Sequence, residues 1–366
     1  MTTRREFLET GVALSAAAAL PRFAFAESPF APSPGAWRNF EIVTRLEIAG
    51  AEGATQAWVP VPAFEDDDWF RSAGSKWTTN AASAALKRDP KYRAEMLHVA
   101  WAPGEKAPVV EVNSGVSTRD RAIDLSKPGT VKPLTEAESR LYTEATDLIP
   151  VDGIVKATSD RITAGSTTDL EKARAIYEWV VENTFRDAAT RGCGVGDVAA
   201  MLNSGNLSGK CADLNALYVG LARAAGLPAR DVYGLRVAPS KFGYKSLGAN
   251  FEVVTKSQHC RAEVYLADFG WVPVDPADVR KVVLEEPPGQ LAIDDPKVVA
   301  ARKTLFGAWE GNWLAYNVAH DVALPGAQGP KLKFLMYPQA ETAGVRLDCL
   351  DPDTFVYAIK ATEVSA

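Results

Sequence analysis

The sequence predicts an α+β protein, in which an N-terminal antiparallel β domain is followed by a core of helices packed on an antiparallel sheet. Two changes in apolar spacing support this fold class. Between residues 37 and 112, apolar side chains alternate with polar ones in short runs, which is typical of strands. After Pro133 the spacing becomes that of amphipathic helices, and a strand–turn–strand pattern returns at residues 259–275.

The β domain is expected to span residues 36–128. Its predicted strands lie near residues 40–48, 57–62, 96–101 and 109–112. Residues 135–366 are expected to form a second domain that ends in C-terminal strands, with its most informative motifs between residues 150 and 280.

Capping residues mark the helices of this second domain. Thr135 with Glu138 matches the capping box, in which each side chain accepts a hydrogen bond from the other residue's backbone. Another helix is predicted near 154–162. Thr168 or Asp169 is predicted to cap a helix over 170–183, whose apolar residues form a single stripe.

Composition excludes several functional classes. The 366 residues include 40 Lys and Arg against 46 Asp and Glu, a formal charge of −6, which argues against nucleic acid as the main partner. Four Cys are too few for a disulfide scaffold. No run of about 18 apolar residues is available to span a membrane.

The first 26 residues resemble a twin-arginine export signal. Arg4 and Arg5 precede a short, Ala-rich apolar stretch, and Ala24 and Ala26 provide the small residues that a signal peptidase reads. The resemblance implies a periplasmic or secreted protein with no membrane span after cleavage, in an oxidising compartment.

Cys211 is predicted to lie in the first turn of a helix. Apolar residues recur at helical spacing from Leu214 to Ala225, and Ser208-Gly209 is read as the cap-and-turn pair before the helix. At this position the backbone N–H groups and the helix dipole stabilise a thiolate. Cys211 is therefore the candidate nucleophile.

His259 is the candidate base and Asp275 its partner. They lie on the two strands of a predicted hairpin, and a loop over residues 266–270 places Arg261 opposite Asp275 with His259 as the diagonal neighbour. Diagonal side chains on one face of a hairpin can meet, so we expect a close approach of His259 and Asp275. The other two histidines, His98 and His320, are read as structural.

These motifs together resemble the bacterial transglutaminase-like superfamily. The resemblance rests on Gly-Lys-Cys211-Ala-Asp, on Ala-Arg-Ala-Ala-Gly-Leu-Pro-Ala-Arg230, on His259 and on Val-Pro-Val-Asp275-Pro, and it covers about residues 150–280. It implies a papain-like core with Cys211 as nucleophile, His259 as general base and acid, and Asp275 as orienting carboxylate. Arg261 departs from the Trp that such sequences often have two residues after the His, which puts substrate preference in doubt.

This family implies chemistry on amide bonds of proteins or peptides through a thioester on Cys211, with its backbone N–H as the first oxyanion donor. Water as acceptor gives hydrolysis, which we favour because no dedicated amine site is evident. A primary amine as acceptor gives transamidation. A catalytically silent peptide-binding module is the remaining alternative. No cofactor or metal is expected.

The remaining cysteines allow other interpretations. Cys193, Cys211, Cys260 and His259 could in principle surround Zn²⁺, but His259 and Cys260 point to opposite faces of a strand and no C-x-x-C pair exists. A disulfide between two of Cys193, Cys260 and Cys349 remains open, as does a free Cys260.

Some polar and aromatic residues near the motifs have ordinary explanations. Asn206 could donate to the oxyanion but fits a polar turn residue better, and Asp213 and Asn215 are read as helix-surface or capping residues. The aromatic cluster around Trp309 and Trp313 is expected to be buried core rather than a peptide-binding wall.

Overall fold

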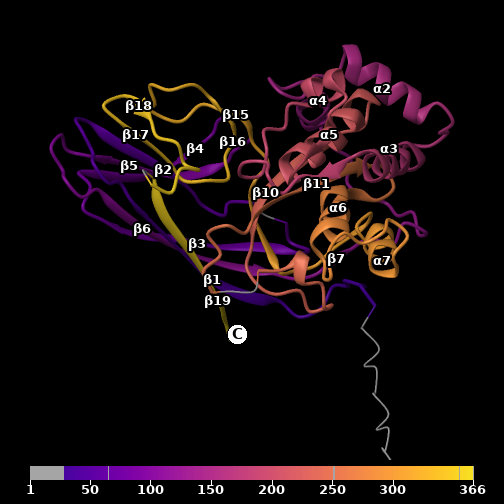
Figure 1. Ribbon diagram of the computed structural model, residues 1–366, viewed down its shortest axis with the longest axis horizontal. Coiled ribbons are helices and arrows are strands. Elements are labelled where there is room, and N and C mark those ends of the chain that lie inside the picture. Colours follow the sequence, from indigo (N-terminus) through magenta and orange to yellow (C-terminus); the bar gives the residue numbers. More distant parts are fainter. Residues whose placement is uncertain (1–28, 65, 250–251, 354, 366) are drawn as a thin grey trace, which may run out of the picture.

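The structure is a computed structural model that describes residues 29–64, 66–249, 252–353 and 355–365. The predicted export signal lies outside these residues. Two regions make up the molecule, one built of long strands and one in which helices surround a smaller sheet (Figure 1). This is the α+β architecture that the sequence predicts.

Two antiparallel sheets face each other in the β region across a shared apolar core that includes Leu46, Val59, Val99 and Val112. The strand orders are β19-β1-β6-β3 and β18-β17-β2-β5-β4. The strands are β1 (Arg38–Glu47), β2 (Thr55–Pro60), β3 (Phe70–Thr79), β4 (Ser83–Arg88), β5 (Glu95–Trp101), β6 (Val109–Thr118), β17 (Gln339–Thr342), β18 (Val345–Arg346) and β19 (Val356–Val364).

The helical region surrounds one long helix, α5 (Cys211–Ala224), which packs on the sheet β12-β11-β10-β14. Every residue of α5 is buried. The other elements are β7 (Arg121–Ala122), α1 (Glu136–Thr143), α2 (Gly153–Thr163), α3 (Asp169–Asn183), β8 (Phe185–Arg186), α4 (Val198–Ser204), β9 (Ser208–Gly209), β10 (Ala229–Arg236), the 3₁₀ turn η1 (Lys245–Leu247), β11 (Gln258–Leu266), β12 (Gly270–Val274), α6 (Pro276–Glu285), α7 (Pro296–Thr304), β13 (Ala308–Trp309), β14 (Trp313–Asn317), β15 (His320–Val322) and β16 (Leu332–Phe334).

Local signals located the starts of the helices that were predicted, whereas α4, α6 and α7 were missed. Thr135 and Glu138 form the predicted capping box of α1, and Thr168 with Glu171 forms another at α3. One detail was wrong: Ser208-Gly209 is the short strand β9, and Lys210 is the residue before the first turn of α5. Strands β3 and β4 were missed, because their side chains are mostly exposed or half-buried and show no clear apolar alternation.

The hairpin of β11 and β12 has the predicted register. Val264 pairs with Val272 and Leu266 with Gly270, so the same ladder continued places Arg261 opposite Asp275. The pairing extends one step further than expected, leaving a turn of residues 267–269. This register puts the start of β11 and the end of β12 at one end of the sheet, against the first turn of α5.

The C-terminal strands are placed differently from the expectation. Strand β19 pairs with β1 and β17 pairs with β2, so these strands complete the N-terminal sheets instead of extending the helical region. The pairing residues are about 300 positions apart, and a local pattern carries no information on such partners. The first and last strands of the described chain therefore lie side by side (Figure 1).

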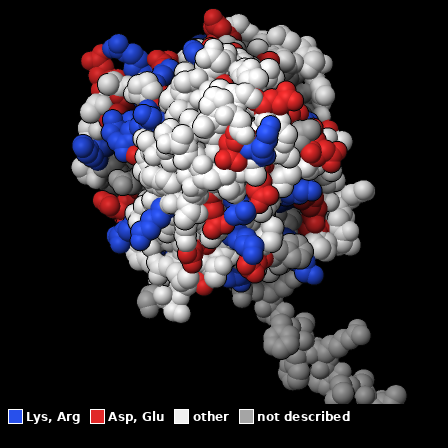
Figure 2. All heavy atoms as spheres, turned by 90° about the vertical axis from the view of Figure 1, so that its left-hand side faces the viewer, with Lys and Arg blue, Asp and Glu red and all other residues white. Residues whose placement is uncertain are grey.

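The aromatic cluster is core, as predicted. Trp309 and Trp313 are almost fully buried and pack with Trp69 from the β region, joining the two parts of the molecule. Among the described residues, no helix is both long and apolar enough to cross a membrane. On the face of the β region shown in Figure 2, basic and acidic side chains are interspersed and no continuous basic band crosses it.

Candidate active site

The N-terminus of α5 positions Cys211. The Lys210 N–H donates to the Asp213 carboxylate at 3.0 Å, and the Ala212 N–H donates to the Cys193 carbonyl at 2.9 Å. These bonds fix the first turn of the helix and the loop in front of it. The Cys211 side chain lies at the wall of a pocket of about 500 Å³, which opens between α5, the start of β11 and the C-terminal segment.

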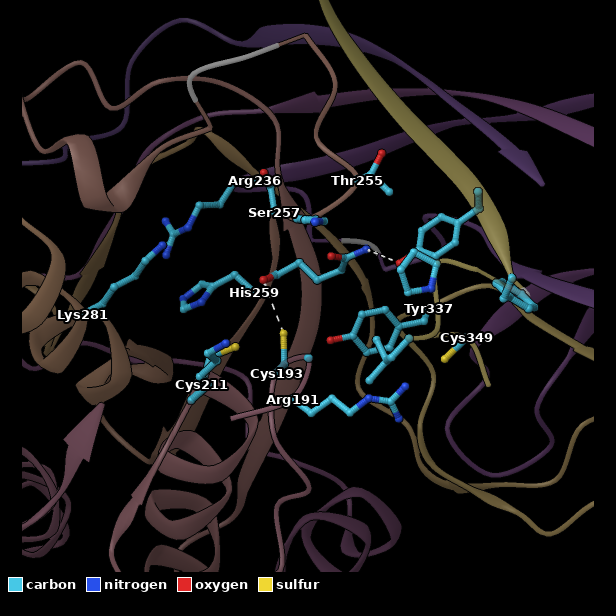
Figure 3. Close-up of a pocket in the computed structure, with 18 of the residues that line it drawn as sticks. Arg191, Cys193, Cys211, Arg236, Thr255, Ser257, His259, Lys281, Tyr337 and Cys349 are labelled. Atoms are coloured by element: carbon cyan, nitrogen blue, oxygen red, sulfur yellow. Dashed lines mark hydrogen bonds between the residues drawn. The ribbon is translucent and has the colours of Figure 1, made fainter. Parts of the chain in front are cut away.

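His259 and Asp275 form a buried pair beside this cysteine. The His259 Nε2 atom lies 2.7 Å from Asp275 Oδ2, which confirms the predicted close approach. Since Nε2 is engaged by the carboxylate, Nδ1 is the ring nitrogen that does not face it. His259 and Cys211 line the same pocket and lie next to each other in Figure 3.

A second carboxylate, Asp278, also faces the imidazole. Its Oδ1 lies 3.3 Å from His259 Nε2 and accepts from Arg236 Nη2 at 2.5 Å. Burial and Arg236 disfavour the imidazolium, but Asp278 and Asp275 outweigh them and raise the pKa of His259 above its ordinary value. Despite its burial, Arg236 and His259 hold the pKa of Asp278 well below the ordinary range. The site therefore stabilises the charged imidazole relative to that of a free histidine.

Asp275 is held from several sides. Its Oδ1 accepts from the Asp278 N–H at 3.0 Å as the N-cap of α6, and Asn215 Nδ2 lies 3.4 Å from the same atom. Arg261 Nε lies 3.6 Å from Oδ2. Burial and Asp278 raise the pKa of Asp275, whereas His259 and Arg261 oppose that rise. These contacts fix the carboxylate that orients the imidazole.

Arg261 does not form a wall of the pocket. It is buried, its guanidinium lies over the rings of Trp313 and Trp309 at 4.7 and 5.2 Å, and it donates to the Glu310 carbonyl at 3.2 Å. Arg261, where related sequences often have Trp, therefore lies beside Asp275 and not in the pocket. Its location does not support the expectation that it contacts the substrate.

Three cysteines meet at this site. The sulfur atoms of Cys193, Cys211 and Cys260 all lie within 4.8 Å of one another, and all four cysteines of the chain are free. His259 is not part of this group, because its Nε2 faces Asp275 and Asp278 instead. The four-ligand Zn²⁺ arrangement considered from the sequence is thus not assembled.

The neighbouring polar residues have distinct positions. Asn206 accepts from Ser208 in an exposed turn, as expected. Asp213 is buried and caps α5, which fits its predicted capping role. Asn215 is not on the helix surface: it is buried and donates to the Cys260 carbonyl at 2.8 Å, linking α5 to β11.

Sequence reasoning missed two groups of site residues. Asp278 follows Asp275 by one helical turn, a spacing that could have indicated a second carboxylate at the imidazole, whereas its partner Arg236 comes from another strand and gives no local signal. The far wall of the pocket comes from residues in the C-terminal segment, among them Tyr337, Leu350 and Tyr357.

Comparison with known proteins agrees with this arrangement. The sequence profile described as the transglutaminase-like superfamily matches residues 156–276, which contain Cys211, His259 and Asp275. An uncharacterised protein of Haemophilus influenzae is 37% identical over 324 residues, covering 84% of this chain and 86% of its own length. The chain belongs to the same family as this protein, and its residues 156–276 match the transglutaminase-like superfamily.

Two solved structures are similar to the fold. A candidate cysteine protease from Cytophaga hutchinsonii is similar over 90% of this chain and 99% of its own, with a TM-score of 0.50 and 13% identity. The periplasmic domain of TgpA from Pseudomonas aeruginosa matches 66% of this chain and 88% of its own, with a TM-score of 0.33 and 16% identity. The Cytophaga protein thus shares the fold across both the β region and the core.

Proposed function

We propose that this protein is a thiol enzyme that cleaves amide bonds of proteins or peptides, with Cys211 as nucleophile, His259 as general acid and base, and Asp275 as the orienting carboxylate. The observation that carries the proposal is that Cys211 and His259 line one pocket, with the cysteine at a helix N-terminus and the imidazole 2.7 Å from the buried Asp275 carboxylate.

The reaction follows from these positions. The Cys211 sulfur attacks the amide carbonyl, and the backbone N–H of Cys211 stabilises the oxyanion. The imidazolium of His259 gives its proton to the leaving amine as the C–N bond breaks, which leaves a thioester on Cys211. Water then gives its proton to His259 and attacks the thioester, so that the C–S bond breaks and a carboxylic acid is released.

Hydrolysis is favoured over protein crosslinking by the charge of the pocket. Six of the residues that line it in the described chain are Lys or Arg, and none is Asp or Glu. The ε-amine of an acceptor lysine is protonated at neutral pH, so such a wall repels it, whereas water enters freely. Transamidation to an uncharged amine is the alternative outcome of the same thioester.

The test compares the wild type with Cys211→Ala and Cys211→Ser. Both are treated with a thiol-directed probe and then with peptide amides, with and without a primary amine. We expect labelling and amide cleavage that depend on Cys211, with a carboxylic acid as product even when amine is present. Wild-type protein that shows no Cys211-dependent turnover on any peptide would instead support a binding module.

An exported location is part of the proposal. The support is the Arg4-Arg5 pair followed by the Ala-rich stretch. Fractionation of cells that express the full chain should find the shortened protein outside the cytoplasm. Replacing both arginines with lysine should retain the full-length chain inside, and an unchanged distribution would contradict the proposal.

A further inference from the structure

The charged side chains that line the pocket beside Cys211 are all cationic. The cationic side chains that line it come from six different places in the chain, and they are Arg186, Arg191, Lys210, Arg236, Lys256 and Lys281. The carboxylates paired with them are Asp278 on Arg236, Asp348 on Arg191, and Glu285, which is shared by Arg186 and Lys281. Within the described residues, Lys210 and Lys256 form no ion pair. Positive charge is therefore in excess.

Three of these cations, Arg186, Arg236 and Lys281, lie near one another. Arg236 and Arg186 both lie close enough to disfavour the charge on Lys281, whose side chain is only 17% exposed. Burial and Arg236 lower the pKa of Lys281 to about 8. Figure 3 shows Lys281 and Arg236 at the end of the pocket next to His259, while Tyr337 and Cys349 lie on the other side.

Two carboxylates, Asp278 and Glu285, neutralise only part of the charge of these three cations. Asp278 is already engaged by Arg236 at 2.5 Å and by His259 at 3.3 Å. Glu285 contacts Arg186, and its distance to Lys281 is 3.7 Å. Keeping a half-buried ammonium beside two guanidinium groups costs free energy, and an anion bound at this point would offset the cost.

We propose that the substrate places a carboxylate against Lys281 and Arg186, close to the amide that Cys211 attacks, so that the enzyme selects acidic peptides. This inference rests on the proposed function. The pocket of about 500 Å³ is of the size that holds a few peptide residues. The opposite wall, with Tyr337, Phe355 and Tyr357, is aromatic and suits the uncharged part of the same peptide.

The first experiment uses pairs of fluorogenic peptide amides that differ only by Glu or Gln, placed at each of the two positions on either side of the amide. We expect at least one position at which Glu raises kcat/KM by about tenfold, as one desolvated ion pair can supply. The preference should weaken between 50 and 500 mM NaCl, since salt screens charges. Equal values for all Glu and Gln pairs would overturn the inference.

Substitutions test whether Lys281 and Arg186 are the side chains that recognise the carboxylate. Lys281→Met and Arg186→Met should each reduce the Glu-to-Gln ratio of kcat/KM, and Lys281→Arg should restore much of it. Lys106→Met removes an exposed charge of the β region and should leave the ratio unchanged. A ratio that survives in the Lys281→Met, Arg186→Met double variant would also overturn the inference. Thermal unfolding and the rate of Cys211 alkylation show whether each variant is folded.

A binding measurement separates this inference from the proposed function. The Cys211→Ala protein is titrated with the Glu and Gln peptides, with a peptide whose only anion is its C-terminal carboxylate, and with inorganic phosphate. Tighter binding of the Glu peptide would show that the site holds a side-chain carboxylate. Tighter binding of the peptide whose only anion is its C-terminus would show that the site holds a terminal carboxylate. Equal binding of charged and neutral peptides, or binding of phosphate alone, would contradict a peptide carboxylate even if amide cleavage is observed.

Discussion

Asp275 performs two tasks with one carboxylate. Its Oδ2 accepts from His259 Nε2, and its Oδ1 caps α6 through the Asp278 N–H. A substitution at this residue therefore affects both the charge felt by the imidazole and the start of a helix. An asparagine keeps one acceptor oxygen without the charge, which allows the two contributions to be separated.

We expect Asp275→Ala to lower kcat/KM by about 10²- to 10⁴-fold and Asp275→Asn to lower it less, because Asn can still orient the ring. Asp275 is one of the two carboxylates that raise the pKa of His259. Without its charge the imidazole loses its proton at lower pH, so the alkaline limb of the kcat/KM profile should move to lower pH in both variants. An alkaline limb that stays at the wild-type position would contradict this role.

Asp231 is a buried residue whose negative charge destabilises the folded protein. It lies on β10, is buried, and neither carboxylate oxygen has a hydrogen-bond partner among the described residues, although His320 Nε2 lies 3.4 Å from Oδ2. Burial raises the pKa of Asp231 to about 7, from an ordinary value of 3.8. Between these values the folded state holds a proton that the unfolded state has lost, so stability falls as the pH rises.

The expected result is that the contribution of Asp231 to the free energy of unfolding, taken as the difference between the wild type and Asp231→Asn, decreases from about pH 4 to pH 7 by about 1.4 kcal/mol for each unit of pKa difference. Asp231→Asn cannot ionise and should flatten this dependence, with the largest relative gain above pH 7. Urea unfolding at several pH values measures it. Asp268→Asn, in the exposed turn after β11, is the control and should keep the wild-type slope.

At the scale of elements, one buried carboxylate joins α5 to the loop before it. Asp213 accepts from the N–H groups of Val195 and Gly196 at 2.8 and 2.9 Å, besides that of Lys210. Gly194 has φ +98°, and a Cβ at this position would overlap the Asp213 carboxylate. The loop that carries Cys193 is thus held against the helix by Asp213 and by the absence of a side chain at Gly194.

Asp213→Ala should release this loop. The three N–H groups lose a charged acceptor, so we expect a loss of about 3 kcal/mol in the free energy of unfolding and faster alkylation of Cys193. The matched control is Asp197→Ala, which removes the cap of α4 at Ala200 and should cost only about 1 kcal/mol. Alkylation of Cys193 at the wild-type rate in Asp213→Ala would show that Asp213 does not hold the loop.

The elements that the sequence predicts are those whose evidence is local. The capping box at Thr135, the first turn at Cys211 and the hairpin register around Asp275 depend on residues within about one supersecondary unit. Arg236, which holds Asp278, lies on a strand that is adjacent only after folding. The buried position of Asn215 depends on the contact of α5 with β11, because spacing alone does not distinguish the sides of a helix that is buried all round.

On the scale of the whole molecule, the C-terminal strand connects the β region to the pocket. Strand β19 pairs along β1, while the Val254 N–H donates to the Ile359 carbonyl at 2.8 Å, just before β11 begins. Tyr357 accepts from Gln258 Nε2 at 3.2 Å, and both line the pocket. No pattern near Cys211 could reveal the C-terminal part of this wall, because Tyr337, Leu350 and Tyr357 follow Cys211 by more than 120 positions.

Ile359 tests whether the molecule unfolds as one unit. Its side chain is 1% exposed between the two regions, so Ile359→Ala should reduce the free energy of unfolding by about 2 to 5 kcal/mol. Because β19 joins the pocket wall to β1, we expect amide cleavage and tryptophan fluorescence to be lost at the same urea concentration, lower than in the wild type. Val364→Ala, at the exposed end of the same strand, should change stability by no more than about 0.5 kcal/mol. Cleavage that persists after the fluorescence transition would mean that the helical region folds without the β region, and β19 would then be a docking strand without influence on the site.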